Sequence, residues 1–263
     1  MRRRAGAEDL MVNEFWRTNL ILKVCKGSTA YGINIDEDLA KTTGLPVSDT
    51  DYMGICVPPK EYVIGLKDRE FEQYTSKDPD ETVYALKKYM RLALNSNPSI
   101  IETLFMPQQF IVYVTAVGRK LIEYRHLFLS KRIKEAFKHY ASAQQKQLVN
   151  KRRNAANRVY LVEKYGFDTK YAMHLVRLLR TGIEVLKDGE FYFPRPDAQE
   201  LLDIRTGKYT LAEVNEMAED LKTQLEDAYF RSKLPEEPDF DRASKLCVEL
   251  HEEFWEGGKQ GSK

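Results

Sequence analysis

Two short apolar segments, each bordered by residues with specific chemistry, constrain this chain more than any other feature. Leu20–Val24 runs into the pair Gly27-Ser28, and Tyr52–Val57 is preceded by Asp49 and Asp51. A strand that ends in Gly-Ser presents backbone N–H groups and a hydroxyl at the start of the next helix, which suits phosphate oxygens. Carboxylates two residues apart project from one face of a strand, and they repel each other unless a cation such as Mg²⁺ neutralises them.

The order of these two motifs predicts more than either motif alone. Gly-Ser after a strand is usually a turn, and an isolated Asp-x-Asp is more often surface charge than a metal site. Here both are flanked by apolar residues, and the second follows the first closely along the chain. A phosphate cradle beside a two-carboxylate metal site is the equipment for nucleotidyl transfer.

The sequence resembles the DNA polymerase β nucleotidyltransferase superfamily, whose motif is GS followed by DxD on the next strand. The resemblance is closer to one subgroup, the RNA-ligase-associated polymerase-β-like (RlaP) family. This chain has GSTAYG, SDTDYMG, ALKKYMRLAL and NPSIIETLF at the corresponding places, and continues with KYAMHLVRLL, Asp203–Gly207 and LPEEPD. The resemblance therefore covers nearly the whole chain.

The resemblance implies an α+β fold in two domains. Residues 1–115 would form a nucleotidyltransferase domain with a small mixed sheet and helices, and residues 116–263 an all-α domain. The pattern from Val117 onward is almost entirely helical, with apolar residues at helical spacing in four segments. These segments are Leu121–Leu129, Ile133–Tyr140, Tyr171–Leu186 and Leu211–Tyr229.

Three acids would hold two Mg²⁺ ions in such an enzyme, and the third is expected on a neighbouring strand. Asp80 is preferred over Glu81, because only one of two consecutive strand residues can face the site. Asp78 is a weaker candidate, and all three could be loop acids. The expected activity is transfer of a nucleoside monophosphate from an NTP to an acceptor hydroxyl by Asp49, Asp51 and Asp80.

Further residues are expected to bind the nucleotide. The resemblance assigns Gly27 and Ser28 to the β- and γ-phosphates and adds Tyr31 of the same motif. Lys170, His174 and Arg177 share one face of a helix at spacings i, i+4 and i+7, which suits a triphosphate or an RNA backbone. The alternative is a solvent-facing stripe with a structural histidine. Glu102 could support the residues of the site from behind, or it could have a structural role that holds a Lys or Arg in the core. The two roles are equally favoured.

Charge distribution indicates a partner, although the total does not. Lys and Arg number 41 against 40 acids, but residues 131–158 carry a net charge of +8 and residues 197–241 a net charge of −8. The basic segment favours an RNA 3′ end as acceptor, with Lys151, Arg152 and Arg153 as RNA-binding residues. The alternative is a helix face balanced by the acidic segment.

The remaining features indicate a cytoplasmic, soluble protein. The three cysteines form no CxxC pair, and no apolar run is long enough to cross a membrane. The residues between Gly32 and Ser48 are expected to form a polar loop, and Asn97-Pro98 to start a helix. Two other functions stay open: nucleotidylation (AMPylation) of a protein or small molecule, and a non-catalytic RNA-binding or antitoxin-like role.

Overall fold

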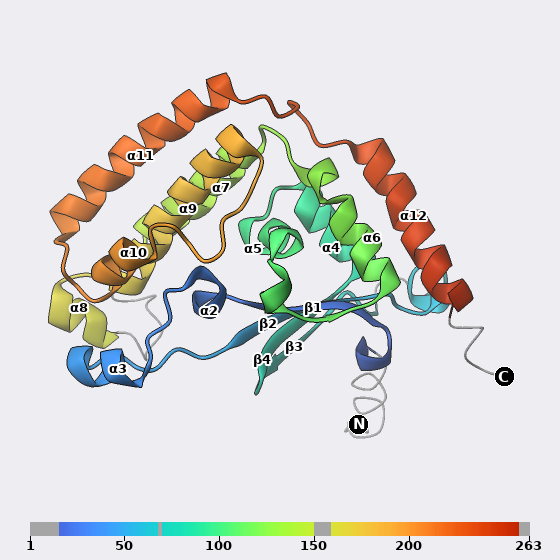
Figure 1. Cartoon of the computed structure of the whole chain (residues 1–263), viewed down its shortest axis with the longest axis horizontal. Helices are drawn as coiled ribbons and strands as arrows, with labels where there is room; N and C mark the ends of the chain where they lie inside the picture. The colour runs from blue at the N-terminus through green and yellow to red at the C-terminus, as the bar shows by residue number, and fades with distance from the viewer. Residues whose placement is uncertain (1–15, 68–69, 150–158, 258–263) are drawn as a thin grey trace, which may run out of the picture.

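A small mixed sheet carries the N-terminal half, and helices cover one of its faces (Figure 1). The computed structural model describes residues 16–67, 70–149 and 159–257. The strands of these residues are β1 (Leu20–Lys26), β2 (Asp51–Cys56), β3 (Gln73–Lys77), β4 (Asp80–Ala85) and β5 (Ile111–Val114). They lie in the order β3-β4-β2-β1-β5. β2 and β4 are parallel, and every other pair is antiparallel.

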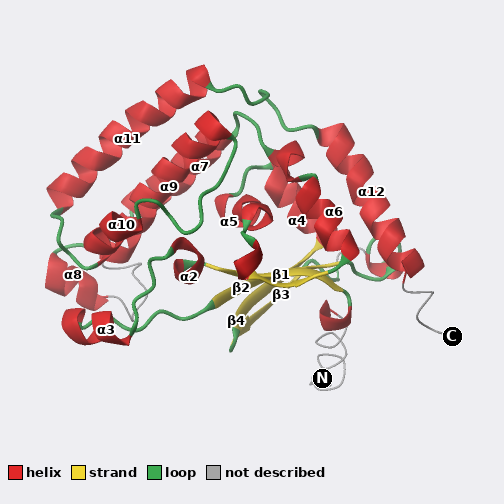
Figure 2. Cartoon of the chain, viewed as in Figure 1, coloured by secondary structure: helices red, strands yellow, loops and turns green. Residues whose placement is uncertain are grey.

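Helices make up most of the rest, and Figure 2 shows them gathered on one side of the strands. In the N-terminal half they are α2 (Ser28–Tyr31), α3 (Glu37–Thr43), α4 (Leu86–Leu94) and α5 (Pro98–Ile101). The C-terminal half contains α6 (Ala116–Glu123), α7 (Ile133–Gln145), α8 (Val159–Tyr165), α9 (Thr169–Asp188), α10 (Ala198–Arg205), α11 (Leu211–Arg231) and α12 (Phe240–Gly257). Short 3₁₀ turns occur at Lys60–Tyr62, Glu102–Phe105, Gln108–Phe110 and Arg125–Phe128.

The α+β prediction is confirmed, and two local expectations are wrong. Residues 33–47 are not simply a loop: they contain α3, because the Asp36 side chain accepts a hydrogen bond from the Leu39 N–H and Gly44 ends the helix in the left-handed region. The expected helix Leu121–Leu129 ends at Glu123 and gives way to a 3₁₀ turn. The helix start at Asn97-Pro98 is confirmed.

The largest hydrophobic core crosses the expected boundary between residues 115 and 116. It joins Ile21 and Val24 of β1 to α4, α7, α9 and α11, and it extends to Leu250 of α12. Helix α12 returns to pack on α4 and α6 at the far end of the sheet from α2 (Figure 1). The division into two domains stays a prediction. None of the helices in the described part of the chain is both long enough and apolar enough to cross a bilayer.

Candidate active site

Four charged residues form a row across one end of the sheet. Lys26 and Asp51 are cross-strand partners of β1 and β2, and Lys77 and Asp80 are partners of β3 and β4. The parallel pairing of Tyr52 with Glu81 places Asp51 and Asp80 one position earlier on adjacent strands. Register partners point to the same face. The row therefore reads lysine, aspartate, aspartate, lysine, with the two acids side by side.

Asp51 lies against the Gly-Ser turn that connects β1 to α2. Gly27 has φ 72° and ψ −147°, a backbone conformation that is essentially restricted to glycine. A Cβ at this position would also collide with Oδ2 of Asp51. The carboxylate thus occupies the space that a side chain at position 27 would take, which brings the turn and the acid into direct contact.

The electrostatics of Asp51 reflect its crowded position. Partial burial raises the pKa of Asp51 above its ordinary value, and the negative charge of Asp80 raises it further. Lys26 and Lys170 lower it, and Asp49 raises it slightly. These residues are therefore close enough to influence one another, although Asp49 itself is exposed in the segment before β2. That segment is fixed by Ser48, whose Oγ accepts a 2.9 Å hydrogen bond from the Ile35 N–H.

The structure distinguishes the three candidates for the third acid. Asp80 is exposed at the start of β4 and shares the face of Asp51. Glu81 is buried on the opposite face, where Oε1 lies 2.7 Å from Lys23 Nζ. Asp78 precedes β4 in the turn after β3. The geometry favours Asp80, and its catalytic role stays a prediction.

The stripe on α9 runs from the open site into the protein interior. Lys170 is exposed and acts on Asp51, and His174 one turn later is half-buried. Arg177 is only 6% exposed, and its guanidinium lies 4.0 Å from the centre of the Tyr31 ring. Lys170 therefore lies exposed near Asp51, and its role as a nucleotide ligand stays a prediction, whereas Arg177 is enclosed by protein.

Tyr31, Glu102 and Arg177 form a buried polar triad. The Tyr31 hydroxyl donates a 2.5 Å hydrogen bond to Oε1 of Glu102, and Arg177 Nη1 lies 3.5 Å from Oε2. Burial raises the pKa of Tyr31 well above its ordinary range, so the phenol stays protonated and can donate. This arrangement agrees with the structural role expected for Glu102, in which it holds a Lys or Arg in the core. Tyr31 and Arg177 as nucleotide ligands stay predictions, and their burial favours a role in holding α2 against α9.

Lys26 and Lys77 were not among the residues expected from the sequence. Both flank the acids through strand register, which becomes known only when the strand pairs are known. The signal that could have identified Lys26 is its position directly before Gly27, at the end of an apolar run. Nothing in the polar segment QYTSK indicates a strand or a site for Lys77.

Comparison with known proteins assigns the chain to a family. The model of the family described as "RlaP: RNA repair pathway DNA polymerase beta family" matches residues 8–249. The chain belongs to this family. The predicted resemblance to RlaP is thereby confirmed, and the protein is a nucleotidyltransferase of the polymerase β type from an RNA repair family.

The other comparisons add little to the RlaP assignment. No curated protein sequence matches the chain at a significant level. A solved structure, that of a nucleotidyltransferase-like protein from Exiguobacterium sibiricum, shares 10% identity over 95% of this chain and 78% of that chain, with a TM-score of 0.28. At this TM-score and identity, the solved structure supports no conclusion about the fold or the function of this chain.

The basic segment of this RlaP chain is partly neutralised within the fold. Four of its residues form ion pairs with three glutamates of the acidic segment: Lys131 with Glu236, Arg132 with Glu237, and Lys134 and Lys138 with Glu226. The proposed RNA-binding residues Lys151, Arg152 and Arg153 lie outside the described residues. The alternative of a helix face balanced by acidic residues thus describes the four paired residues in the described part of the segment, residues 131–149.

Proposed function

We propose that this RlaP protein is a Mg²⁺-dependent nucleotidyltransferase that transfers a nucleoside monophosphate from an NTP to the 3′ hydroxyl of an RNA. The observation that supports this best is the pair Asp51 and Asp80, adjacent on parallel strands, with Asp51 in contact with the turn at Gly27. Lys26 and Lys170 act on the same carboxylate. Two acids flanked by cations beside the half-buried backbone at Gly27 suit a triphosphate with its metal.

The donor set fits Mg²⁺ in its chemistry. All candidate ligands are carboxylates. Burial is the main cause of the raised pKa of Asp51, and the repulsion from Asp80 that adds to it is what a cation would relieve. Among the described residues, no three His, Cys, Asp or Glu side chains lie close enough together to hold a metal by themselves. Mg²⁺ usually binds through one or two carboxylates together with substrate phosphates. Asp51 and Asp80, with Asp49 beside them, would therefore hold it when the nucleotide is present.

Each residue then has a defined task. Bound Mg²⁺ would supply electrostatic stabilisation to the attacking and leaving oxygens. Asp80 would accept the proton of the acceptor hydroxyl, whose oxygen forms a bond to the α-phosphorus while the bond to pyrophosphate breaks. Pyrophosphate leaves with the electron pair of that bond. The backbone at Gly27, the Ser28 hydroxyl and the Lys170 ammonium would hold the terminal phosphates.

A labelling experiment tests the reaction and its acceptor together. The purified protein is incubated with each α-labelled NTP, Mg²⁺ and an RNA that ends in a 3′ hydroxyl. The matched control RNA carries a 3′-deoxy end. We expect label on the first RNA alone, and none with the Asp51→Asn variant. Label on the protein or on a small molecule would favour the alternative nucleotidylation, and label nowhere would favour a non-catalytic RNA-binding role.

The RNA acceptor depends on the basic segment, which calls for its own experiment. Reversing Lys151, Arg152 and Arg153 to Glu leaves Asp51 and Asp80 untouched. If these residues neutralise RNA phosphates, the slope of log affinity against log salt becomes shallower by ~0.7 for each phosphate that the variant no longer neutralises. Turnover on a dinucleotide acceptor should change little. An unaltered slope would remove this support for RNA, and a protein or small-molecule acceptor would become the better hypothesis.

A further inference from the structure

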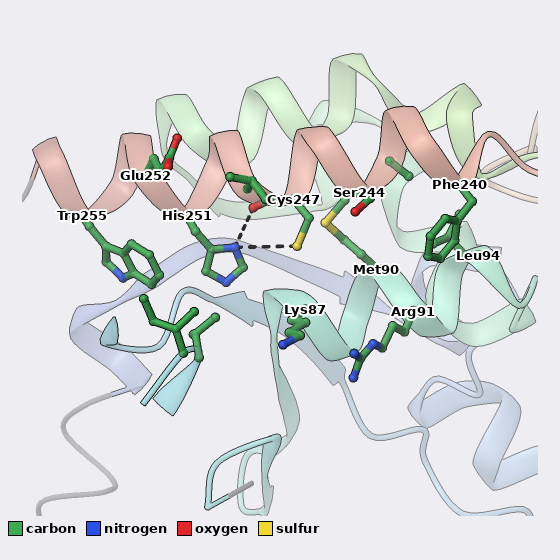
Figure 3. A pocket seen from close by; sticks show the side chains of 14 residues that line it. Lys87, Met90, Arg91, Leu94, Phe240, Ser244, Cys247, His251, Glu252 and Trp255 are labelled. Carbon is green, nitrogen blue, oxygen red and sulfur yellow. Dashed lines mark hydrogen bonds between the residues drawn. The ribbon is translucent and has the colours of Figure 1, made fainter. Parts of the chain in front are cut away.

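A cavity of about 360 Å³ lies between α4 and α12, at the opposite end of the sheet from the candidate active site. About 17 Å of strand separates Asp80, at the start of β4, from Ala85, after which α4 begins. Figure 3 shows side chains of both helices converging on the cavity. Its size is within the range of ligand-binding pockets, ~300–1,000 Å³. Neither the proposed transfer reaction nor the RlaP family assignment uses it.

The walls of the cavity are apolar and aromatic. Met90 and Leu94 of α4 lie near Ser244 and Phe240 at one end of the cavity, and Trp255 of α12 lies beside His251 at the other end. The indole of Trp255 is held in place, because its Nε1–H donates a 2.9 Å hydrogen bond to the carbonyl of Pro58. Phe240 is 64% exposed at the rim, although it is a large apolar side chain. A flat apolar group such as a nucleobase would bury the part of this surface around Trp255 and His251.

His251 contributes a single unpartnered polar atom to this cavity. Its Nδ1 lies 2.6 Å from the carbonyl oxygen of Cys247, which can only accept, so Nδ1 carries the hydrogen. Burial lowers the pKa of His251, which favours the neutral ring. Nε2 is then a hydrogen-bond acceptor, and it is buried without a partner among the described residues. A ligand that brings an N–H group would satisfy it.

Two cations stand at the edge of the cavity. Lys87 and Arg91 lie one turn apart on the exposed side of α4, and neither side chain forms an ion pair or hydrogen bond with another described residue. Both also line an adjoining hollow of about 560 Å³. They therefore stand between two cavities, where a phosphate could be bound while its base enters the apolar one.

We propose that the cavity between α4 and α12 is a second nucleotide-binding site, which takes a base with an N–H donor against His251 and its phosphate against Lys87 and Arg91. A protein segment could also cover the apolar walls and meet the acceptor with a backbone N–H, and the self-association measurement below tests that alternative. The nucleotide is either free or part of an RNA strand, since both present the same base and phosphate.

Trp255 reports directly on occupancy of this site. The protein has two tryptophans, and Trp16 belongs to a separate hydrophobic cluster. We would titrate the Asp51→Asn variant, in which the active site is disabled, with each ribonucleoside monophosphate, with adenosine and with hexa-adenylate. We expect at least one nucleotide to quench the fluorescence, with no such change in Trp255→Phe. Adenosine should bind at least fivefold more weakly than AMP, because it lacks the phosphate.

Charge-reversal variants complete the test. Lys87→Glu and Arg91→Glu should each raise the Kd at least fivefold. Lys245→Glu, an exposed reversal on α12 outside the cavity, is the matched control and should stay within twofold. Equal affinity for AMP and hexa-adenylate would identify a free-nucleotide site, and preference for hexa-adenylate an RNA subsite. Absence of quenching at millimolar nucleotide, or quenching that neither reversal weakens, would overturn the proposal. Concentration-dependent self-association that Phe240→Ser abolishes, without nucleotide binding, would also overturn it and identify the cavity as a protein contact.

Discussion

Replacing Glu102 by Gln tests whether the buried triad holds α2 and α9 together. The side chains of Glu102 and Arg177 are 3% and 8% exposed, so the pair is shielded from solvent. The amide oxygen of the new glutamine can still accept a hydrogen bond from the Tyr31 hydroxyl. The substitution removes the negative charge that faces Arg177, and the glutamine can turn its N–H₂ group toward the guanidinium. Breaking one partner of a buried pair costs ~3–5 kcal/mol, because the other charge is left uncompensated.

The lower end of this range applies here. The 3.5 Å separation is long for an ion pair, and the cation–π contact of Arg177 with Tyr31 remains in the variant. We therefore expect the free energy of unfolding to fall by ~3 kcal/mol, which corresponds to a Tm lower by roughly 6–12 °C for a chain of this size. Urea unfolding followed by circular dichroism measures the difference.

Two further variants make the reasoning refutable. Arg177→Met removes the charge that Glu102 compensates, so the double variant should lose clearly less stability than the sum of the two single losses. Asp38→Asn, in the exposed pair with Lys41, should show no measurable change. Strict additivity, or a loss in Glu102→Gln below about 0.5 kcal/mol, would show that the triad does not hold the helices together.

Four predictions concern the candidate active site. Because the pKa of Asp51 is raised in the folded state, ionisation of Asp51 lowers the stability of the protein as the pH rises through that pKa. Without metal, Asp51→Asn should therefore be more stable than wild type at pH 7 and lose this advantage below about pH 4. Thermal melts at both pH values would show the difference. Mg²⁺ should stabilise wild type more than Asp51→Asn. Asp80→Asn should reduce turnover more than Glu81→Gln. Glu81→Gln should lower the Tm more, because it leaves Lys23 without its buried partner. The reverse order of turnover in steady-state assays would transfer the catalytic role to Glu81. Gly27→Ala should cost ~1–3 kcal/mol of stability through its backbone conformation and displace Asp51, so retention of wild-type turnover would contradict the contact between them.

The sequence predicted those parts of the fold that carry a local pattern. The apolar residues of β1 and β2 and the helical period of α9 and α11 were sufficient to place these elements within a few residues. β3 was missed because its residues Gln73–Lys77 are polar and only alternately half-buried, as befits an edge strand. β5 has an apolar sequence, but only its pairing with β1 identifies it as a strand.

The candidate site shows the same division between local and long-range information. Strand parity predicted that Asp80 and Glu81 point to opposite faces, but which of them shares a face with Asp51 follows only from the register with β2. Arg177 was expected to bind phosphate because its spacing from Lys170 is helical. That role stays a prediction. The triad that Arg177 joins spans 71 positions from Tyr31 to Glu102 and 75 from Glu102 to Arg177, so no local pattern could reveal it.

The position of β1 inside the sheet affects how the chain emerges during synthesis. β1 is made before the other four strands of its sheet, yet its second neighbour, β5, ends at Val114, and α12, which packs on α4, begins at Phe240. At ~5–20 residues per second, the ribosome needs roughly 10–40 s between the end of β1 and the start of α12. Until the end of that interval, the apolar side of α4 that α12 covers in the finished protein has no partner. The nascent chain therefore leaves this apolar surface open to aggregation and to chaperone binding until α12 is made.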